Sequence, residues 1–269
     1  TPCGTLFPYT TLFRSPDDIA AQVDQVRQQI IDGEIEVPYI TESGGEATEL
    51  PESVETDEPV AETFPAIPAD ELRVAAVFPG SINDEGFNQV AYQGLLAIRD
   101  EMGAEIAFSE RTPIADFNQV YRDFAEQGYH VIIGHGFQFG EVALEVAPDY
   151  PDIRFIVDNN SEVSGDNIAG IAARAWDAAY LMGALAGLMT ESDQIGGIAG
   201  FDMPNIVAQM EAYKMGARDV NPDVETTVIY IGTFEDVANG KEAALAQASA
   251  GVDVIFHIAD AAGVGVIQA

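Results

Sequence analysis

Residues 72–109, LRVAAVFPGSINDEGFNQVAYQGLLAIRDEMGAEIAFS, decide the fold class of this chain. An apolar run at residues 72–78 is followed by a helical pattern at residues 87–101 and by a second apolar run at residues 104–109. Short apolar strands that alternate with helices indicate βαβ units, in which helices cover a parallel sheet. The stretch therefore predicts an α/β protein with parallel sheets.

The same alternation continues along the rest of the chain. Further apolar runs lie at residues 130–134, 153–158, 167–173, 194–200, 226–232 and 252–258. The helical patterns between them lie at residues 117–127, 140–146, 176–189, 206–219 and 237–248. Because ligands in this architecture bind at the carboxyl ends of the strands, the loops that follow the strands are the place to look for function.

The region before residue 71 has a different organisation. Residues 1–15 have no helical or strand period, and we interpret them as a non-native tail from translated vector or adapter sequence. Residues 16–40 predict an amphipathic helix that Gly33 ends, followed by a short extended strand. Residues 41–70 are rich in acids and Pro and contain no Lys or Arg, which predicts a solvated disordered linker.

Net charge excludes several classes of partner. The chain has 45 acidic residues against 11 Lys and Arg, a formal charge of −34. Such a surface repels nucleic acid and anionic membranes, so no nucleic-acid partner is expected. The excess indicates either adaptation to high salt or an acidic linker added to an ordinary acidic surface. Melting temperature measured against KCl separates the two, because a flat response contradicts salt adaptation.

Motifs for catalysis, metals and cofactors are absent from the sequence. The three histidines, His130, His135 and His257, lack metal-ligand spacing, and there is no GxSxG or phosphate-binding loop. Cys3 is the single cysteine, so no internal disulfide forms. No secretory or lipidation signal is visible, and the apolar stretch at residues 178–189 is too short to span a bilayer. We therefore expect no enzyme activity, catalytic residue, metal or cofactor.

The loop PGSINDEGFNQ, residues 79–89, is the first candidate site. It follows the first predicted strand and opens a helix, where unpaired amides would lie beside polar groups and an aromatic face. Its candidate ligand-binding residues are Asn83, Asp84, Phe87 and Asn88. The structural alternative is an Asp helix cap with Phe87 in the core.

Loops after other strands supply the remaining candidates. Phe137 lies in GHGFQFGE, where a plain strand-to-helix turn with a buried Phe is the alternative. Asp158 ends a predicted strand in VDNNSE, Phe234 lies in GTFED, and Asp260 lies in HIADAAGVG. Each signal is weak alone, and their common position after strands is what selects them.

Several motifs in order resemble one known family. They are INDEGFNQVAYQGL at residues 82–95, IIGHGFQFGEVALEVAPDYPDIRFIVD at 132–158, YLMGALAGLM at 180–189, IGGIAGFDMPNIVAQMEAYKMGA at 195–217, IGTFEDVANGKEAA at 231–244 and VDVIFHIADAAGVG at 252–265. Residues 72–269 thereby resemble the basic membrane protein family of substrate-binding lipoproteins, which includes purine nucleoside receptors of ABC importers.

This resemblance implies a type I periplasmic-binding-protein fold with two Rossmann-like lobes that close on a ligand. The lobes would span residues 71–173 and 174–269, the second being C-terminally truncated. Phe87 and Phe234 would sandwich a base. Asp84, Asn88, Phe137 and Asp158 would line the cleft. The implied partners are a nucleoside or similar small molecule and the ABC permease subunits, and the implied location is extracytoplasmic, membrane-anchored or periplasmic.

The chain also departs from that family. Phe78 and Pro79 stand where nucleoside-binding relatives place an acid that holds ribose, and Asp260 and Ala261 stand where the family has small flexible residues. Residues 17–38 resemble the family's C-terminal end, which implies a tandem of two binding modules; an ordinary helix before the domain is the alternative. A ligand-sensing domain without transport is the alternative function.

Overall fold

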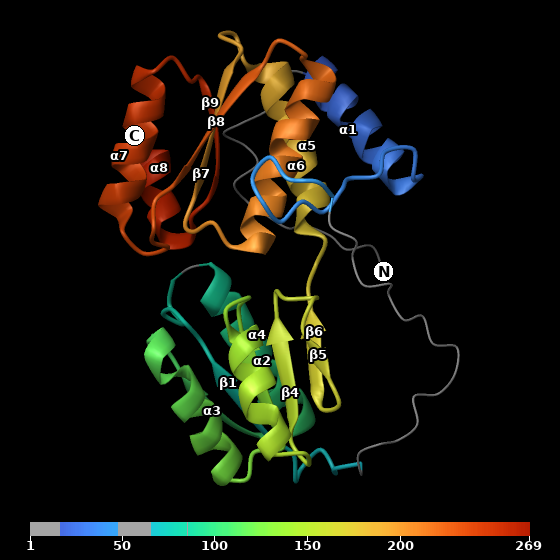
Figure 1. The fold of residues 1–269 in the computed structure, drawn as a ribbon, viewed down its shortest axis with the longest axis vertical. Coiled ribbons are helices and arrows are strands. Elements are labelled where there is room, and N and C mark those ends of the chain that lie inside the picture. The colour runs from blue at the N-terminus through green and yellow to red at the C-terminus, as the bar shows by residue number, and fades with distance from the viewer. Residues whose placement is uncertain (1–16, 48–65, 85) are drawn as a thin grey trace.

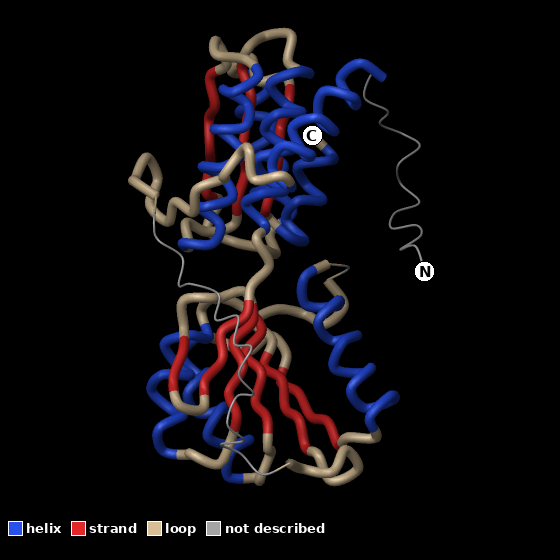
Figure 2. Tube along the Cα trace, turned by 90° about the vertical axis from the view of Figure 1, so that its right-hand side faces the viewer, coloured by secondary structure: helices blue, strands red, loops and turns tan. Residues whose placement is uncertain are grey.

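Residues 17–47, 66–84 and 86–269 are described in the computed structural model. They form two α/β lobes, one above the other, that are joined by a short connection (Figures 1 and 2). The interpretation of residues 1–15 as a tail, and residues 48–65 of the predicted linker, lie outside the described residues.

The first lobe is built on a sheet with strand order β2-β1-β3-β4-β6-β5, parallel except for β5. Its strands are β1 (Arg73–Val77), β2 (Glu105–Ser109), β3 (Val131–His135), β4 (Arg154–Asp158), β5 (Ser164–Gly165) and β6 (Ile168–Ile171). Its helices are α2 (Phe87–Met102), η1 (Ile114–Asp116), α3 (Phe117–Glu126), α4 (Phe139–Val146) and η2 (Ala147–Asp149). Sequence reasoning missed the two-residue strand β5.

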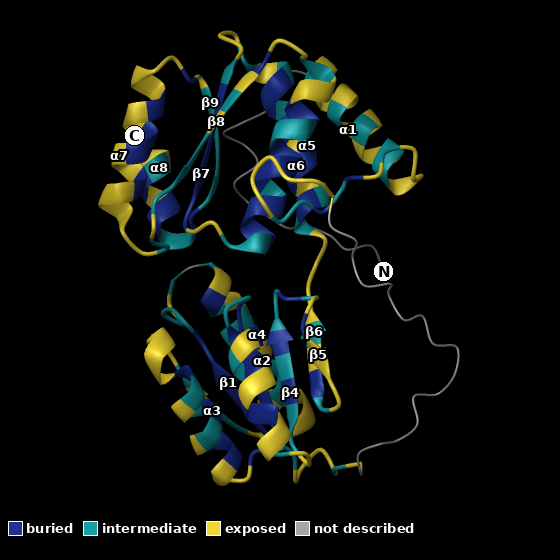
Figure 3. Cartoon of the chain, viewed as in Figure 1, coloured by how far each residue is buried: buried dark blue, intermediate teal, exposed yellow. Residues whose placement is uncertain are grey.

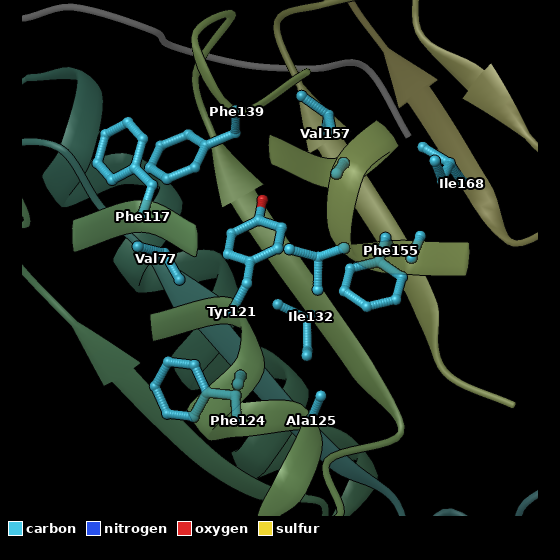
Figure 4. Packing of buried hydrophobic residues seen from close by; sticks show 14 of the residues in the cluster. Val77, Phe117, Tyr121, Phe124, Ala125, Ile132, Phe139, Phe155, Val157 and Ile168 are labelled. Carbon is cyan, nitrogen blue, oxygen red and sulfur yellow. The ribbon is translucent and has the colours of Figure 1, made fainter. Parts of the chain in front are cut away.

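Both faces of this sheet are covered. Along β1, Val74 and Ala76 pack with α2, whereas Ala75 and Val77 pack with α3 and α4, as the alternation of side chains along a strand requires. On the second face, rings of Phe117 and Phe139 stack at a centroid distance of 4.1 Å, and Figure 4 shows Tyr121 beside them. Burial of each large apolar side chain contributes about 1.5–3 kcal/mol, which fixes the sheet beneath the candidate loops.

The second lobe has a smaller parallel sheet with the order β8-β7-β9. Its elements are α5 (Ala175–Met189), β7 (Gln194–Ala199), α6 (Pro204–Val220), β8 (Glu225–Tyr230), α7 (Val237–Ser249), β9 (Val254–Ile258), η3 (Asp260–Ala262) and α8 (Gly263–Gln268). The central strand β7 is buried between α5 and α6 on one face and α7 and α8 on the other (Figures 1 and 3). The predicted α/β class with parallel sheets is confirmed.

The helix α1 (Asp17–Ile31) and the segment after it pack on the second lobe, beside α5 (Figure 1). Val37 and Tyr39 are buried with Trp176, and the Tyr39 and Trp176 ring centroids lie 4.6 Å apart. The Tyr39 hydroxyl donates a hydrogen bond to Glu162 Oε1 of the first lobe at 3.0 Å. This segment therefore contacts both lobes.

The prediction of a strand within residues 16–40 is wrong. Residues 34–40 pair with neither sheet, because Val37 and Tyr39 turn toward the helices of the second lobe instead of toward a strand edge. Of the predicted linker, residues 41–47 and 66–70 are described. A turn lies at Ser43 and Gly44, and the Ser43 hydroxyl donates to Glu211 Oε1 at 3.1 Å.

Tyr39→Phe is expected to lower the free energy of unfolding by about 1 kcal/mol, because it removes one hydrogen bond from a buried side chain and preserves its packing. Urea unfolding measures the change. Ser43→Ala removes a hydrogen bond from the same N-terminal segment to the second lobe alone and serves as the control. A Tyr39→Phe protein as stable as the unmodified chain would show that the hydrogen bond from Tyr39 to Glu162 does not stabilise the fold.

None of the helices in the described part of the chain combines the length and apolar character needed to cross a bilayer. The apolar helix α5, which carries the stretch singled out in the sequence, is covered by α1 and α6.

Candidate ligand-binding site

Asp84 organises the loop between β1 and α2. Its carboxylate accepts hydrogen bonds from the backbone amides of Gly86 (3.0 Å), Asn88 (2.9 Å) and Gln89 (3.0 Å), and from Asn88 Nδ2 at 2.7 Å. Burial would raise the pKa of Asp84, but the bonds from Asn88, Gln89 and Gly86 outweigh it and hold the pKa below its usual range. The carboxylate thus caps α2, the structural alternative left open by the sequence.

The two asparagines of this loop differ in position. Asn88 is only 4% exposed, and its Oδ1 accepts from the Gly80 amide at 3.4 Å, so its side chain holds the loop together. Asn83 is exposed, and its backbone amide donates to Ser81 Oγ at 3.2 Å. The Asn88 side chain therefore positions the loop, whereas the Asn83 side chain is exposed to solvent.

Phe87 lies at the start of α2 against a histidine that sequence reasoning did not assign to the site. The rings of Phe87 and His135 stack at 3.8 Å with an interplanar angle of 25°, and His135 Nε2 lies 3.0 Å from the Phe87 carbonyl oxygen. His135 Nδ1 lies 2.7 Å from Asp158 Oδ2. His135 is 4% exposed, so these contacts fix the imidazole as a support for one face of Phe87.

The strand register explains why His135 and Asp158 meet. They are paired positions at the carboxyl ends of β3 and β4. The other oxygen of Asp158 accepts from the Asn159 amide at 2.8 Å. The predicted run at residues 130–134 stops one residue before His135, so the sequence pattern gave no signal for this pair.

Phe137 lies in the turn that enters α4. Its carbonyl oxygen accepts from Asn160 Nδ2 at 3.0 Å, and Asn160 Oδ1 accepts from the amides of Glu162 and Val163. Asn160 is buried, so the turns after β3 and β4 are locked together. This fixes the backbone of Phe137, as a strand-to-helix turn requires.

In the second lobe, Phe234 lies after β8 and packs edge to face on Phe201, with ring centroids 5.2 Å apart. Its carbonyl oxygen accepts from the Ala262 amide at 2.9 Å, which places η3 beside it. Asp260, the first residue of η3, has a left-handed backbone conformation with φ of 48°. For a residue other than glycine this conformation is uncommon.

Asp260 reaches from the second lobe to the first. Its carboxyl accepts a hydrogen bond from the Phe87 backbone amide and lies against the carboxyl of Asp84. A Cβ added at Gly86 would lie 2.6 Å from Asp260 Oδ1, so the Asp260 carboxyl lies directly against the Gly86 backbone. The structure therefore brings Asp84, Phe87 and Asp260 together across the interlobe gap.

A small cavity of about 10 Å³, partly open to solvent, lies beside the connection between the lobes. It is lined by Tyr39, Asn159, Ser161, Ala172, Ala173, Ala175, Trp176, Asn205 and Gln209. Trp176 Nε1 and Asn205 Oδ1 are buried there without a partner among the described residues. Ala172 and Ala173, in the connection between the lobes, form one wall.

Metal binding finds no support in the described ranges, which contain no group of three or more His, Cys, Asp or Glu side chains suited to an ion. The eight candidate residues include no Lys or Arg. The candidate residues are thus aromatic, amide and carboxyl side chains.

The family is identified by a match over residues 71–269 to the Bmp model, described as ABC transporter substrate-binding protein PnrA-like. The chain belongs to this family. Among curated relatives of the Bmp chain, basic membrane protein A2 of Borrelia garinii subsp. bavariensis is 28% identical over 73% of this chain and 59% of its own length. The ABC transporter nucleoside-binding protein BmpA of Lactococcus lactis subsp. cremoris is 28% identical over 74% and 58%.

Solved structures show the same fold. A solute-binding protein of an ABC transporter system from Aeropyrum pernix K1 is similar with a TM-score of 0.68 and 27% identity, over 73% of this chain and 57% of that one. The type I periplasmic-binding-protein fold predicted from the sequence is confirmed. The Bmp chain spans about three fifths of the length of the curated relatives described above.

Proposed function

We propose that this Bmp-family chain is the extracytoplasmic substrate-binding component of an ABC importer and captures a purine nucleoside between its lobes. The observation that carries the proposal is the Phe87 ring, which is 37% exposed on the interlobe side of α2 and supported by His135. Stacking on an aromatic face contributes about 1–3 kcal/mol per base. The name of the Lactococcus relative, a nucleoside-binding protein, supports the same ligand class.

The polar groups favour an unphosphorylated ligand. Asp158 keeps lone pairs that could accept from ligand hydroxyl or amino groups, and the charges of Asp84, Asp158 and Asp260 would repel a phosphate. Phe234 on the opposite lobe would cover the second face of the base as the lobes close. Closure would then follow from extra contacts that the ligand makes to both lobes.

A second candidate is a ligand-sensing domain that uses the same fold without transport. It is favoured by the transcriptional activator protein Med of Bacillus subtilis, 27% identical over 73% of this chain and 61% of its own length. A crystal structure of a transcriptional activator of the comK gene from Bacillus halodurans is similar with a TM-score of 0.58 and 27% identity, over 73% of this chain and 66% of that one. Neighbouring permease and ATPase genes would favour the importer, and a fused kinase or helix-turn-helix domain would favour the sensor.

The experiment is a thermal-shift and calorimetric screen of the full chain against inosine, guanosine, hypoxanthine, ribose, glucose and inosine monophosphate. We expect stabilisation by the nucleosides, about 2.7 kcal/mol at a concentration of 100 times Kd. Inosine monophosphate serves as the charge control and is expected to bind weakly. A response to sugars alone, or to none of the compounds, would overturn the nucleoside assignment.

The organisation of residues 17–47 belongs to the same proposal. We propose that they are the end of a preceding module of a tandem binding protein, connected through the acidic segment to the module at residues 71–269. Their packing on the second lobe supports this reading, because a helix and tail of this kind cover apolar surface on α5 and α6. A longer sequence read tests it: a start codon just before Asp17 would remove the tandem.

A further inference from the structure

Asp260 makes a contact between the lobes that the proposed function does not require. It is the residue through which η3 of the second lobe touches the N-terminus of α2 in the first lobe. The contact needs no ligand, because the Asp260 carboxyl itself accepts the hydrogen bond from the Phe87 backbone amide. We infer that Asp260 is a proton-dependent latch that holds the two lobes together when its carboxyl is protonated.

The geometry of the latch is fixed from both sides. Asp84 is held by four hydrogen bonds from its own loop and cannot turn away from Asp260 without uncapping α2. Asp260 is held in a left-handed conformation, which directs its carboxyl to the gap at the position of Gly86. Two carboxyls in contact share a proton favourably but repel each other when both are ionised.

The charged groups that act on Asp260 are both acidic. Asp84 lies on the β1–α2 loop of the first lobe, and Glu235 lies on the β8–α7 loop of the second. On β9, His257 lies against Gly263, and burial lowers the pKa of its imidazole, which keeps the ring neutral. Among the residues that the structure describes, the charges that act on Asp260 thus offer no cation to neutralise a second negative charge.

Burial, followed by the charge of Asp84, raises the pKa of Asp260 to about 6 from its ordinary value of 3.8. A carboxyl with a raised pKa in the closed form binds its proton more tightly there than in the open form. Closure is therefore favoured below about pH 6, and this contribution is lost as the pH rises through 6. Because the pKa of Asp84 is lowered, its carboxylate stays ionised and accepts a hydrogen bond from the protonated Asp260 carboxyl.

The consequence for ligand affinity rests on the proposed function. If nucleoside binds the closed form, a latch that enlarges the closed population tightens binding. Allowing for solvent screening of a half-buried group, we expect about three- to tenfold tighter binding at pH 5 than at pH 7.5.

The test compares the unmodified chain with Asp260→Asn and Glu235→Gln. Asn tolerates the left-handed conformation at least as well as Asp and keeps a hydrogen-bond donor toward Asp84, so Asp260→Asn should fold and stay latched. Small-angle scattering without ligand should show the unmodified chain compact at pH 5 and expanded at pH 7.5. Asp260→Asn should be compact at both, and Glu235→Gln should move the midpoint of expansion to lower pH.

Asp166→Asn, on an exposed turn of the first lobe, is the matched control and should behave as the unmodified chain. An Asp260→Asn protein that expands with pH as the unmodified chain does would overturn the latch, as would an unmodified chain of constant size. Titration with inosine, which is uncharged in this range, separates the two proposals. If compaction depends on Asp260 but inosine does not bind, the latch stands and the nucleoside function is overturned. If inosine binds with the same affinity at pH 5 and pH 7.5, the nucleoside function stands and the latch is overturned.

Discussion

Gly183→Ala should remove about 3 kcal/mol from the free energy of unfolding, because the added methyl group has no room. Gly183 lies on α5 where that helix crosses α6, and an added Cβ would overlap the backbone oxygen of Tyr213. The clash is with backbone, so no side-chain rotation relieves it. The helices would have to separate, and Tyr180 and Tyr213, both buried in this region, would lose packing.

Gly94→Ala is the matched control, because Gly94 lies within α2 with open space around its missing Cβ. There the substitution should stabilise the chain by about 0.5–1 kcal/mol, since alanine loses less entropy in a helix than glycine does. Urea unfolding, followed by circular dichroism, measures both. Equal effects at the two positions would contradict the close α5–α6 contact.

The glycines at this crossing also show what sequence can and cannot predict. The apolar stretch at residues 178–189 indicated a buried helix, and α5 is one. That Gly183 and Gly216 each face the backbone of the opposite helix is a property of the crossing. Local pattern reports which residues avoid water, but not which two surfaces meet.

Some features of the candidate site could likewise be predicted from the sequence, and others could not. The loops after strands were predictable, because parallel strands end at one edge of the sheet. Asp84 as a helix cap followed from residue type and position. His135 was assigned no part because its role depends on the register of β3 against β4, and Asp260 reaches Asp84 only because the lobes approach each other.

The N-terminal segment shows a third limit. Its helical period was visible, and α1 spans Asp17–Ile31 as a helix. Yet a sequence pattern gave no reason to place Tyr39 between Trp176 and Glu162, more than a hundred positions along the chain. A strand was predicted for residues that instead cover helices, because β-branched and aromatic residues suit either environment.

Phe87→Ala should weaken inosine binding by roughly 10- to 100-fold, if the proposed function is right. The loss corresponds to about 1–3 kcal/mol for one stacked base, at about 1.4 kcal/mol for each tenfold change. One face of the Phe87 ring is covered by His135, which leaves the remaining face to a ligand and holds the ring in place for it. Phe87→Tyr keeps the ring and should bind within about threefold of the unmodified chain.

Phe108→Ala is the matched control, because Phe108 is exposed to the same extent as Phe87, 37%, but lies on β2 against Tyr92 and Phe78. It should lower stability and leave the affinity unchanged. Calorimetry at fixed pH keeps the Asp260 latch constant across the series. An affinity that falls equally in Phe87→Ala and Phe108→Ala would mean that the loss comes from weakened folding of the first lobe, and the base would then have to bind elsewhere. Selective loss in Phe87→Ala, with binding retained in Phe87→Tyr, requires an aromatic face at the start of α2, which is what a stacked ligand needs.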